Sequence, residues 1–283
     1  MTDSVCGVLG IDRVDMNGMM TLIEEQHGSD ANFLVNSILA GALEKGQGVC
    51  LVLFHNTFSH YHNIGMKLGY NLSVLRERGQ VAVIEPMSLV SCEIEELGHD
   101  SVDADSVNLC ERKPKEPENS QAPNSMKFDA NIGRKLLFPL RDKCFEVLDS
   151  RDSVVIIVDD LSHLFDAQLS LKDVWFVVRY LRSLMEFEPM VSLYIMTHTY
   201  KADHDSCQPD MIAIGLKHTA DLVVTVQPLA SGKANDVSGR MNIRWKVDSV
   251  RKKYKWAERS CYLYKLSDRQ VRVFPLGTTS GVS

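Results

Sequence analysis

The sequence has 283 residues, of which 45% are hydrophobic and 24% are charged, as in an ordinary globular protein. A chain of this length can bury one large hydrophobic core or two smaller ones, and we expect a single α/β domain over residues 1–283. The formal net charge of −6 excludes a general electrostatic attraction to nucleic acid, although it does not exclude a local basic patch.

The first part of the chain predicts a βαβ unit. The apolar run Met19–Ile23 indicates a short first strand. Apolar residues at four-residue spacing then predict a helix that begins with Asp30 as its N-cap and ends at Gly46. Val49–Phe54 predicts a second buried strand, so we expect a right-handed crossover between two parallel strands.

The next segment predicts a short helix, a strand and an insertion. His55–Gly69 indicates a loop and a short helix that Gly69 closes. Val81–Glu85 predicts a third strand, which Pro86 ends. Residues 93–125 are rich in Asp, Glu, Ser, Asn and Pro, and we interpret them as a flexible acidic insertion within the domain.

The middle of the chain predicts helices on either side of a central strand. Phe128–Ser150 indicates a helix that is interrupted at Pro139. The five apolar residues 154–158 indicate a strand buried on both faces, which ends in Asp159 and Asp160. A second helix begins at Ser170 or Leu171 and carries its apolar residues on one face.

The last part of the chain predicts strands only. Val191–Thr197 and Asp221–Val226 are buried strands, and a polar loop covers Tyr200–Asp210. Alternating apolar and polar residues then predict antiparallel hairpins over Met241–Lys246, Tyr262–Leu266 and Val271–Phe274. The expected fold class is therefore α/β, with a mostly parallel sheet in a three-layer core and C-terminal antiparallel hairpins.

The carboxyl ends of the parallel strands provide the first candidate site. Asp159 and Asp160 lie where nucleotide hydrolases hold Mg²⁺. The phosphate loop of such enzymes needs glycines and a Lys, but Glu24–Asp30 has one Gly, no Lys and three carboxylates. At about 4 Å with a dielectric constant near 20, each like-charge contact costs on the order of 4 kcal/mol.

A base that orients the attacking water is also missing. No Asp or Glu occurs from Gly46 through Leu75, and Glu85 is the only substitute at a strand end. We therefore expect no catalytic residue, no cofactor and no metal site, and we interpret Asp159 and Asp160 as a degenerate Walker B strand end that caps the next turn.

Several sequence blocks resemble the RecA-like ATPase core and, within it, the Elongator complex protein 6 family. The blocks are Phe58–Tyr61, Gly65–Gly69, Arg76–Gln80, Val158–Ser162, Ile243–Trp245 and Tyr262–Gly277. They span nearly the whole chain outside the acidic insertion. The Ser-His-Tyr and Arg-Glu-Arg-Gly-Gln blocks are more specific than the Asp-Asp strand.

The resemblance implies a partner set and a function. It implies a ring in which two related RecA-like Elongator subunits alternate with this chain as a heterohexamer. The ring is an accessory part of Elongator, works with its catalytic subcomplex, binds tRNA and supports wobble-uridine modification. Members of the family lack the phosphate loop. Two alternatives remain open: a ring ATPase that takes residues from a neighbouring subunit, and a RecA-like DNA-repair paralogue.

A basic, aromatic segment is the second candidate site. Its residues are Arg244, Trp245, Lys246, Arg251, Lys252, Lys253, Tyr254, Lys255, Trp256 and Arg259. Cations neutralise phosphates and aromatic rings stack on exposed bases, so we expect a hairpin that contacts RNA, an acidic partner subunit or solvent only. For Phe58, His60 and Tyr61 we expect a role in a subunit interface or in packing.

Other residue patterns give expectations of absence. The sets His55, His60 and His62, and His198, His204 and Cys207, have no recognised metal-ligand spacing. The seven cysteines are scattered without a Cys-x-x-Cys pair, which favours free thiols in a reducing compartment. With no apolar stretch near the roughly 20 residues of a membrane span, we expect a soluble cytoplasmic protein, with the nucleus as an alternative.

Overall fold

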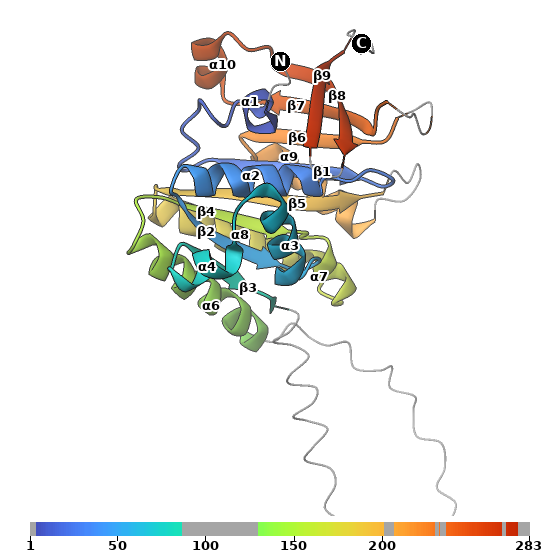
Figure 1. The fold of residues 1–283 in the computed structure, drawn as a ribbon. Helices are drawn as coiled ribbons and strands as arrows, with labels where there is room; N and C mark the ends of the chain where they lie inside the picture. The colour runs from blue at the N-terminus through green and yellow to red at the C-terminus, as the bar shows by residue number, and fades with distance from the viewer. Residues whose placement is uncertain are drawn as a thin grey trace, which may run out of the picture.

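The computed structural model describes residues 4–86, 130–200, 207–229, 232, 236–267 and 270–276. Within them, nine strands form one sheet in the order β3-β2-β4-β5-β1-β6-β7-β8-β9 (Figure 1). The strands are β1 (Met20–Gln26), β2 (Gly48–Leu53), β3 (Val81–Ile84), β4 (Val154–Asp159), β5 (Val191–Thr199), β6 (Leu222–Gln227), β7 (Gly239–Trp245), β8 (Arg259–Ser267) and β9 (Gln270–Pro275). The acidic insertion predicted at 93–125 lies outside the described residues.

The sheet has a parallel part and an antiparallel part. All neighbouring strands from β3 to β6 are parallel, and the pairs β6–β7, β7–β8 and β8–β9 are antiparallel. This arrangement confirms the predicted fold class. All six residues of β4 are buried between β2 and β5, as its unbroken apolar sequence predicts.

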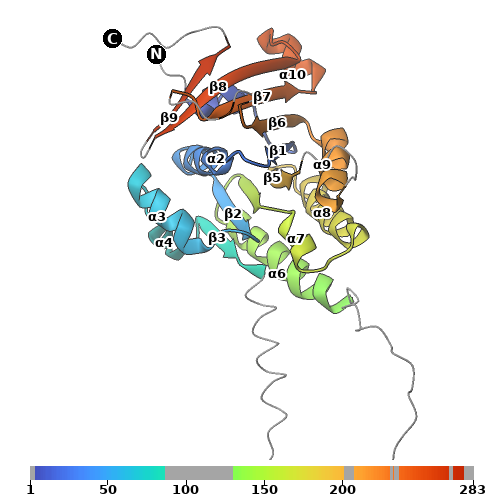
Figure 2. The same cartoon turned by 90° about the vertical axis from the view of Figure 1, so that its right-hand side faces the viewer.

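Helices cover both faces of the parallel part. The described helices, of which α10 contacts β7 and α1 contacts α2 and β9, are α1 (Val5–Leu9), α2 (Asn32–Glu44), α3 (Phe58–Leu68), α4 (Leu72–Glu77), α6 (Ala130–Leu148), α7 (His163–Asp166), α8 (Leu171–Phe187), α9 (Gln208–Thr219) and α10 (Asp248–Tyr254). Figure 2 shows α2, α3 and α4 on one side of the sheet and α7, α8 and α9 on the other. Within the described residues every helix is too short or too polar to cross a lipid bilayer.

The two faces of β4 belong to two hydrophobic cores. Val155 and Ile157 join the core under α2, α3 and α4, whereas Ile156 and Val158 join the core under α6, α8 and α9. This alternation follows from the two-residue period of a strand. Because β4 lies inside both cores, its carboxyl end is held rigidly in the middle of the sheet.

Two predicted helix features are wrong in detail. Ala31, rather than Asp30, is the N-cap residue of α2, although the Asp30 carboxylate accepts a hydrogen bond from the Asn32 N–H. α6 runs through Pro139 without the predicted interruption. Leu137 and Leu140 are buried against the sheet on both sides of this proline, so packing compensates for the missing backbone hydrogen bond.

Candidate functional site

The carboxyl ends of β1, β2, β4 and β5 meet at one edge of the sheet. Glu25 lies opposite His198 in the parallel pair of β1 and β5, and Leu53 lies opposite Asp159 in the pair of β2 and β4. Open α/β sheets bind ligands at such an edge. The predicted phosphate-loop and Walker B positions are therefore brought together, as in the nucleotide hydrolases.

The start of α2 is occupied by carboxylates of the chain itself. Oε2 of Glu25 accepts a 2.7 Å hydrogen bond from the Ala31 N–H, and Oδ1 of Asp30 accepts one of 2.9 Å from the Asn32 N–H. In nucleotide hydrolases these N–H groups at the helix start bind phosphate. Because Glu25 and Asp30 already supply the negative charge that the helix start favours, a phosphate group has no comparable place here.

Glu25 is fixed in this position by His198. The Nδ1 atom of His198 lies 3.2 Å from Oε1 of Glu25. The hydrogen bond to Glu25 is the largest cause that raises the pKa of His198, and burial opposes it. The contact with Glu25 therefore raises the pKa of His198 and favours the protonated ring, whose charge is opposite to that of the carboxylate in the phosphate position.

Glu24, the neighbouring carboxylate, is neutralised on the opposite face of β1. Its side chain is 5% exposed, and its Oε1 lies 2.6 Å from Nζ of Lys217 in α9. Thr225 in β6 donates a 2.8 Å hydrogen bond to Oε2. Lys217 is thus committed to a structural ion pair inside this chain, so it does not replace the missing phosphate-loop Lys.

Asp159 lies at the end of β4 and is fully buried. Its Oδ2 accepts hydrogen bonds from the backbone N–H of Asn56 at 3.2 Å and from Asn56 Nδ2 at 3.0 Å. Within the described residues its Oδ1 has no hydrogen-bond partner. Mg²⁺ binds such a carboxylate together with substrate phosphates. Since Glu25 occupies the phosphate position, these residues do not fit a magnesium nucleotide.

Asp160 stabilises the turn after β4. Its Oδ1 accepts hydrogen bonds from the N–H of Ser162 at 3.0 Å, from Oγ of Ser162 at 2.7 Å and from the N–H of His198 at 3.2 Å. Burial raises the pKa of Asp160, and the bonds from Ser162 oppose that shift. These three hydrogen bonds fix the turn between β4 and α7 and attach it to β5.

Histidines gather at the same edge without forming a metal site. The rings of His55 and His163 stack with centroids 4.3 Å apart, and His27 stacks on Tyr200 at 5.6 Å. Among the described residues, no group of three or more His, Cys, Asp or Glu is arranged to hold a metal ion. His204, named in one of the two candidate sets, lies outside those residues.

The predicted interface residues Phe58, His60 and Tyr61 lie on α3. Tyr61 is 0% exposed and belongs to the core, which agrees with the packing role, one of the two roles expected for these residues. Burial and the nearby Asp159 carboxylate raise the pKa of its phenol. The Phe58 N–H donates a 2.9 Å hydrogen bond to Oε1 of Glu85. Glu85, the strand-end carboxylate considered above in place of the catalytic base, therefore stabilises the start of α3. His60 and Phe58 are partly exposed.

The basic segment connects the antiparallel strands β7 and β8, but α10 lies in the connection where a short turn was expected. Trp245 is 3% exposed, and its indole N–H donates a 3.0 Å hydrogen bond to the backbone oxygen of Leu9. Trp256 packs against Gly10, where a Cβ atom would overlap its ring. Tyr254 donates a 2.7 Å hydrogen bond to the backbone oxygen of Arg13. All three aromatic residues therefore contact the N-terminal segment. Trp245 is too deeply buried to stack on an RNA base, whereas Tyr254 and Trp256 are partly exposed.

The cations of this segment have different environments. Lys246 donates hydrogen bonds to the backbone oxygens of Lys217 and His218, at the end of α9. Arg244 and Arg251 both contact Glu258, and Arg251 also pairs with Asp248. Three lysines project from α10 and the turn after it into solvent: Lys252, Lys253 and Lys255. Lys246 therefore has a structural role, and these three lysines remain candidate contacts.

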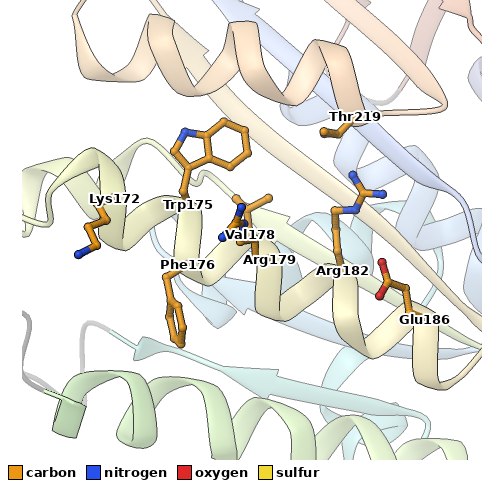
Figure 3. Close-up of a pocket in the computed structure, with 8 residues that line it drawn as sticks. All are labelled: Lys172, Trp175, Phe176, Val178, Arg179, Arg182, Glu186 and Thr219. Carbon is orange, nitrogen blue, oxygen red and sulfur yellow. The ribbon is translucent and has the colours of Figure 1, made fainter.

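A second surface lies on α8, on the side that faces away from the sheet. A hollow of about 860 Å³ is lined by Lys172, Trp175, Phe176, Val178, Arg179, Arg182, Glu186 and Thr219. In Figure 3, Trp175 and Arg182 point toward α9, whereas Phe176 points toward α6. The side chain of Phe176 is 54% exposed, and that of Ile214 on α9 is 52% exposed. This combination of aromatic, aliphatic and basic side chains was not predicted as a site.

Comparison with known proteins gives one family. The family model described as "Elongation complex protein 6" matches residues 8–268. Elongator complex protein 6 of Homo sapiens is 28% identical over 276 residues, which cover 96% of this chain and 95% of the human protein. The Drosophila melanogaster protein of the same name is 25% identical over 279 residues, with 98% of each chain covered.

A comparison of structures agrees with the fold. A KaiC-like protein from the archaeon Pyrococcus horikoshii superposes with a TM-score of 0.53. The match covers 92% of this chain and 90% of the archaeal chain, at 10% sequence identity. At this identity the likeness shows the RecA-like fold alone.

Proposed function

The chain belongs to the Elongation complex protein 6 family, and from that premise we propose that it is a non-catalytic, single-domain subunit of a heterohexameric RecA-like ring. The family places it in the Elongator complex. The proposed partners are two related RecA-like Elongator subunits and the catalytic subcomplex of Elongator. Through this ring the chain supports tRNA binding and wobble-uridine modification, in the cytoplasm and, as an alternative, in the nucleus.

One observation carries the non-catalytic part of the proposal. The Glu25 carboxylate accepts the hydrogen bond from the Ala31 N–H at the start of α2, where a nucleotide hydrolase binds phosphate. His198 holds Glu25 there, and Lys217 is paired with Glu24. The position is therefore filled by charges that stabilise each other without a ligand.

Surface chemistry supports a role in assembly. Apolar side chains are exposed on α8, α9 and the turn between α8 and β5, namely Phe176, Phe187, Met190, Met211 and Ile214. We propose that some of these side chains contribute to surfaces that bind the partner subunits, since exposed apolar patches on soluble proteins are typical of such sites. The surface of this chain, rather than a pocket for a substrate, is where we place its function.

Co-expression with the two partner subunits tests the assembly. We expect the intact complex to have the mass of two copies of each chain, and to retain a tRNA transcript. A chain that stays monomeric in the presence of both partners would contradict the ring. Preference for single-stranded DNA over tRNA would instead favour the DNA-repair paralogue, and nucleotide turnover that appears only in the mixed ring would favour the ring ATPase.

A further inference from the structure

The outward side of α8 forms a surface that we call the α8 face. Its residues recur at three- and four-residue spacing along one side of the helix and are Lys172, Trp175, Phe176, Arg179, Arg182 and Glu186. The opposite side of α8 carries Val174, Val177 and Leu181 into the core. The hollow of about 860 Å³ described above lies along the α8 face (Figure 3).

The α8 face is positively charged. Lys172 and Arg179 are exposed, and Arg182 is half-buried. No carboxylate of the described residues forms an ion pair with any of these three cations. Glu186, at the far end of the face, is the one acidic residue that lines the hollow. The α8 face therefore attracts acidic groups.

Two aromatic rings lie between these cations. Phe176 is 54% exposed and points toward α6 (Figure 3). Trp175 packs against Gly215 of α9, where a Cβ atom would overlap its ring. The position of the Trp175 ring is therefore fixed before anything binds to it, which lowers the entropy cost of binding. A segment that combines acidic and apolar side chains matches this face.

The acidic insertion has that combination. Residues 93–125 contain nine of the 37 acidic and three of the 31 basic residues, so the remaining sequence contains 28 of each. All of the net negative charge of the chain therefore lies in the insertion. Apolar residues are interspersed among its carboxylates, namely Ile94, Leu97, Val102, Val107 and Leu109.

The insertion is attached close to the α8 face. Residues 87–129 join Pro86, after β3, to Ala130 at the start of α6. Because β3, β4 and β5 run in the same direction, α6 and α8 both begin at the carboxyl edge of the sheet, and the two helices are in contact. With up to about 3.3 Å per residue, residues 87–129 can span more than about 100 Å, whereas α8 is about 25 Å long. The length of the insertion thus suffices to reach the whole face.

This attachment favours the insertion over a separate acidic protein. Covalent linkage gives a segment an effective concentration that reaches the order of millimolar at a nearby site. A separate protein at micromolar concentration must bind the same face about a thousandfold more tightly to displace it. The cations of β7 and α10 lie farther away, because β7 is separated from β5 by β1 and β6.

We propose that the acidic insertion binds to the α8 face of its own chain. Its carboxylates between Glu93 and Glu118 pair with Lys172, Arg179 and Arg182, and its apolar residues pack on Phe176. The inference goes beyond the proposed function, because a ring of subunits does not require this contact. It assigns Phe176 to an intramolecular contact and leaves the exposed apolar residues of α9 and of the turn before β5 for the partner subunits.

Cross-linking of the full chain tests the contact. A carbodiimide joins a carboxylate to a lysine amine only where the two touch, so Lys172 reports on the α8 face. We expect mass spectrometry to find Lys172 joined to carboxylates of residues 93–118, and several times less product at the exposed Lys252 and Lys253 of α10. The Lys172 product should fall severalfold between about 0.1 M and about 1 M salt, since the Debye length falls from about 10 Å to about 3 Å. In a mixture of isotope-labelled and unlabelled chains, the product should join residues of one chain.

The indole N–H resonances of the three tryptophans give a second readout. The variant neutralises six carboxylates of the insertion through Glu93→Gln, Glu95→Gln, Glu96→Gln, Asp100→Asn, Asp103→Asn and Asp105→Asn. We expect the Trp175 resonance to shift in this variant, because the segment leaves the α8 face. The resonances of Trp245 and Trp256, which contact the N-terminal segment instead, should stay where they are and serve as internal controls.

Four outcomes would overturn the proposal. They are a Lys172 product no more abundant than those of Lys252 and Lys253, a product that joins two chains, a Trp175 resonance that does not move, and equal shifts of all three resonances. A partner subunit would be the occupant if folded Lys172→Gln, Arg179→Gln, Arg182→Gln chain fails to enter the complex while the neutralised insertion variant enters it. The first two readouts use the single chain, so they leave the proposed ring untouched, which the co-expression experiment tests separately.

Discussion

The Oε2 atom of Glu25 lies 2.7 Å from the backbone nitrogen of Ala31, so the chain places its own carboxylate at the start of α2. In a phosphate-binding loop the corresponding N–H groups are free for a ligand. Here Glu25 also contacts His198, and Asp30 accepts the bond from Asn32. This helix start therefore differs from a phosphate loop in more than the missing Lys, because a carboxylate of the chain lies where such a loop binds phosphate.

The pair of Glu25 and His198 predicts a pH-dependent contribution to stability. The pKa of His198 is raised in the folded state, chiefly by its hydrogen bond to Glu25. The stabilising effect is fully present below the unfolded pKa of about 6.5 and is lost as the pH rises through the folded pKa. Glu25→Gln removes the cause, so the His198 pKa should fall in an NMR titration. An unchanged His198 pKa in this variant would contradict the pairing.

The ion pair between Lys217 and Glu24 predicts a large effect of a single substitution. Lys217→Met leaves the Glu24 carboxylate buried, with Thr225 and Thr199 as its remaining hydrogen-bond donors among the described residues. We expect the free energy of unfolding in urea to fall by about 2–4 kcal/mol. The matched control Lys172→Met, on the exposed face of α8, should change it by less than about 0.5 kcal/mol. Similar effects for both variants would show that Glu24 does not depend on Lys217.

The contact between Trp245 and Leu9 predicts that the N-terminal segment depends on β7. Trp245→Phe removes the hydrogen bond to the Leu9 oxygen but keeps an aromatic ring, and should cost about 1 kcal/mol. Trp245→Ala removes a side chain that is 3% exposed, and should cost about 3–5 kcal/mol. Urea unfolding and hydrogen exchange of residues 5–14 measure both effects. Full exchange protection of these residues in Trp245→Ala would contradict the dependence.

The close approach of α8 and α9 at Gly215 predicts a packing defect. A Cβ atom at Gly215 would overlap the ring of Trp175, so Gly215→Ala must displace this ring or separate the helices. We expect a loss of about 1–3 kcal/mol. The control Met211→Ala, at a residue of the same helix that is 42% exposed, should be nearly neutral. Trp175 fluorescence that is the same in Gly215→Ala and in the unchanged protein would contradict the predicted contact.

The parallel strands and several helix ends could be predicted from the sequence because each has a simple local pattern. Residues 154–158 form an unbroken apolar run, and Gly69 ends a short helix in the left-handed conformation at φ +97°. Ser170 begins α8 with a capping box that includes Asp173. Each of these signals lies within a few consecutive residues, so the element that it defines can be recognised without knowledge of the tertiary structure.

Other features depend on partners that are far away in the sequence. Trp245 and Leu9 are 236 positions apart, and nothing near Trp245 indicates that its ring is buried. Basic residues around it suggested a solvated hairpin, whereas Val250 packs α10 into the core. α9 was not predicted because Gly215 and several polar residues weaken its helical pattern, although Ile212 and Leu216 are buried.

The candidate site was predicted in composition but not in arrangement. The excess of carboxylates in Glu24–Asp30 is visible in the sequence, and it led to the expectation that triphosphate does not bind there. The sequence does not show that Glu24 and Glu25 point to opposite faces of β1, one toward Lys217 and the other toward His198. Strand alternation explains the separation once β1 is known to extend to Gln26.

Calorimetric titration of the purified full chain with magnesium ATP tests the central claim most directly. We expect no saturable heat up to millimolar nucleotide, because the Glu25 carboxylate occupies the start of α2 and Lys217 stays paired with Glu24. Saturable binding in the micromolar range by the single chain, together with release of phosphate, would contradict the account.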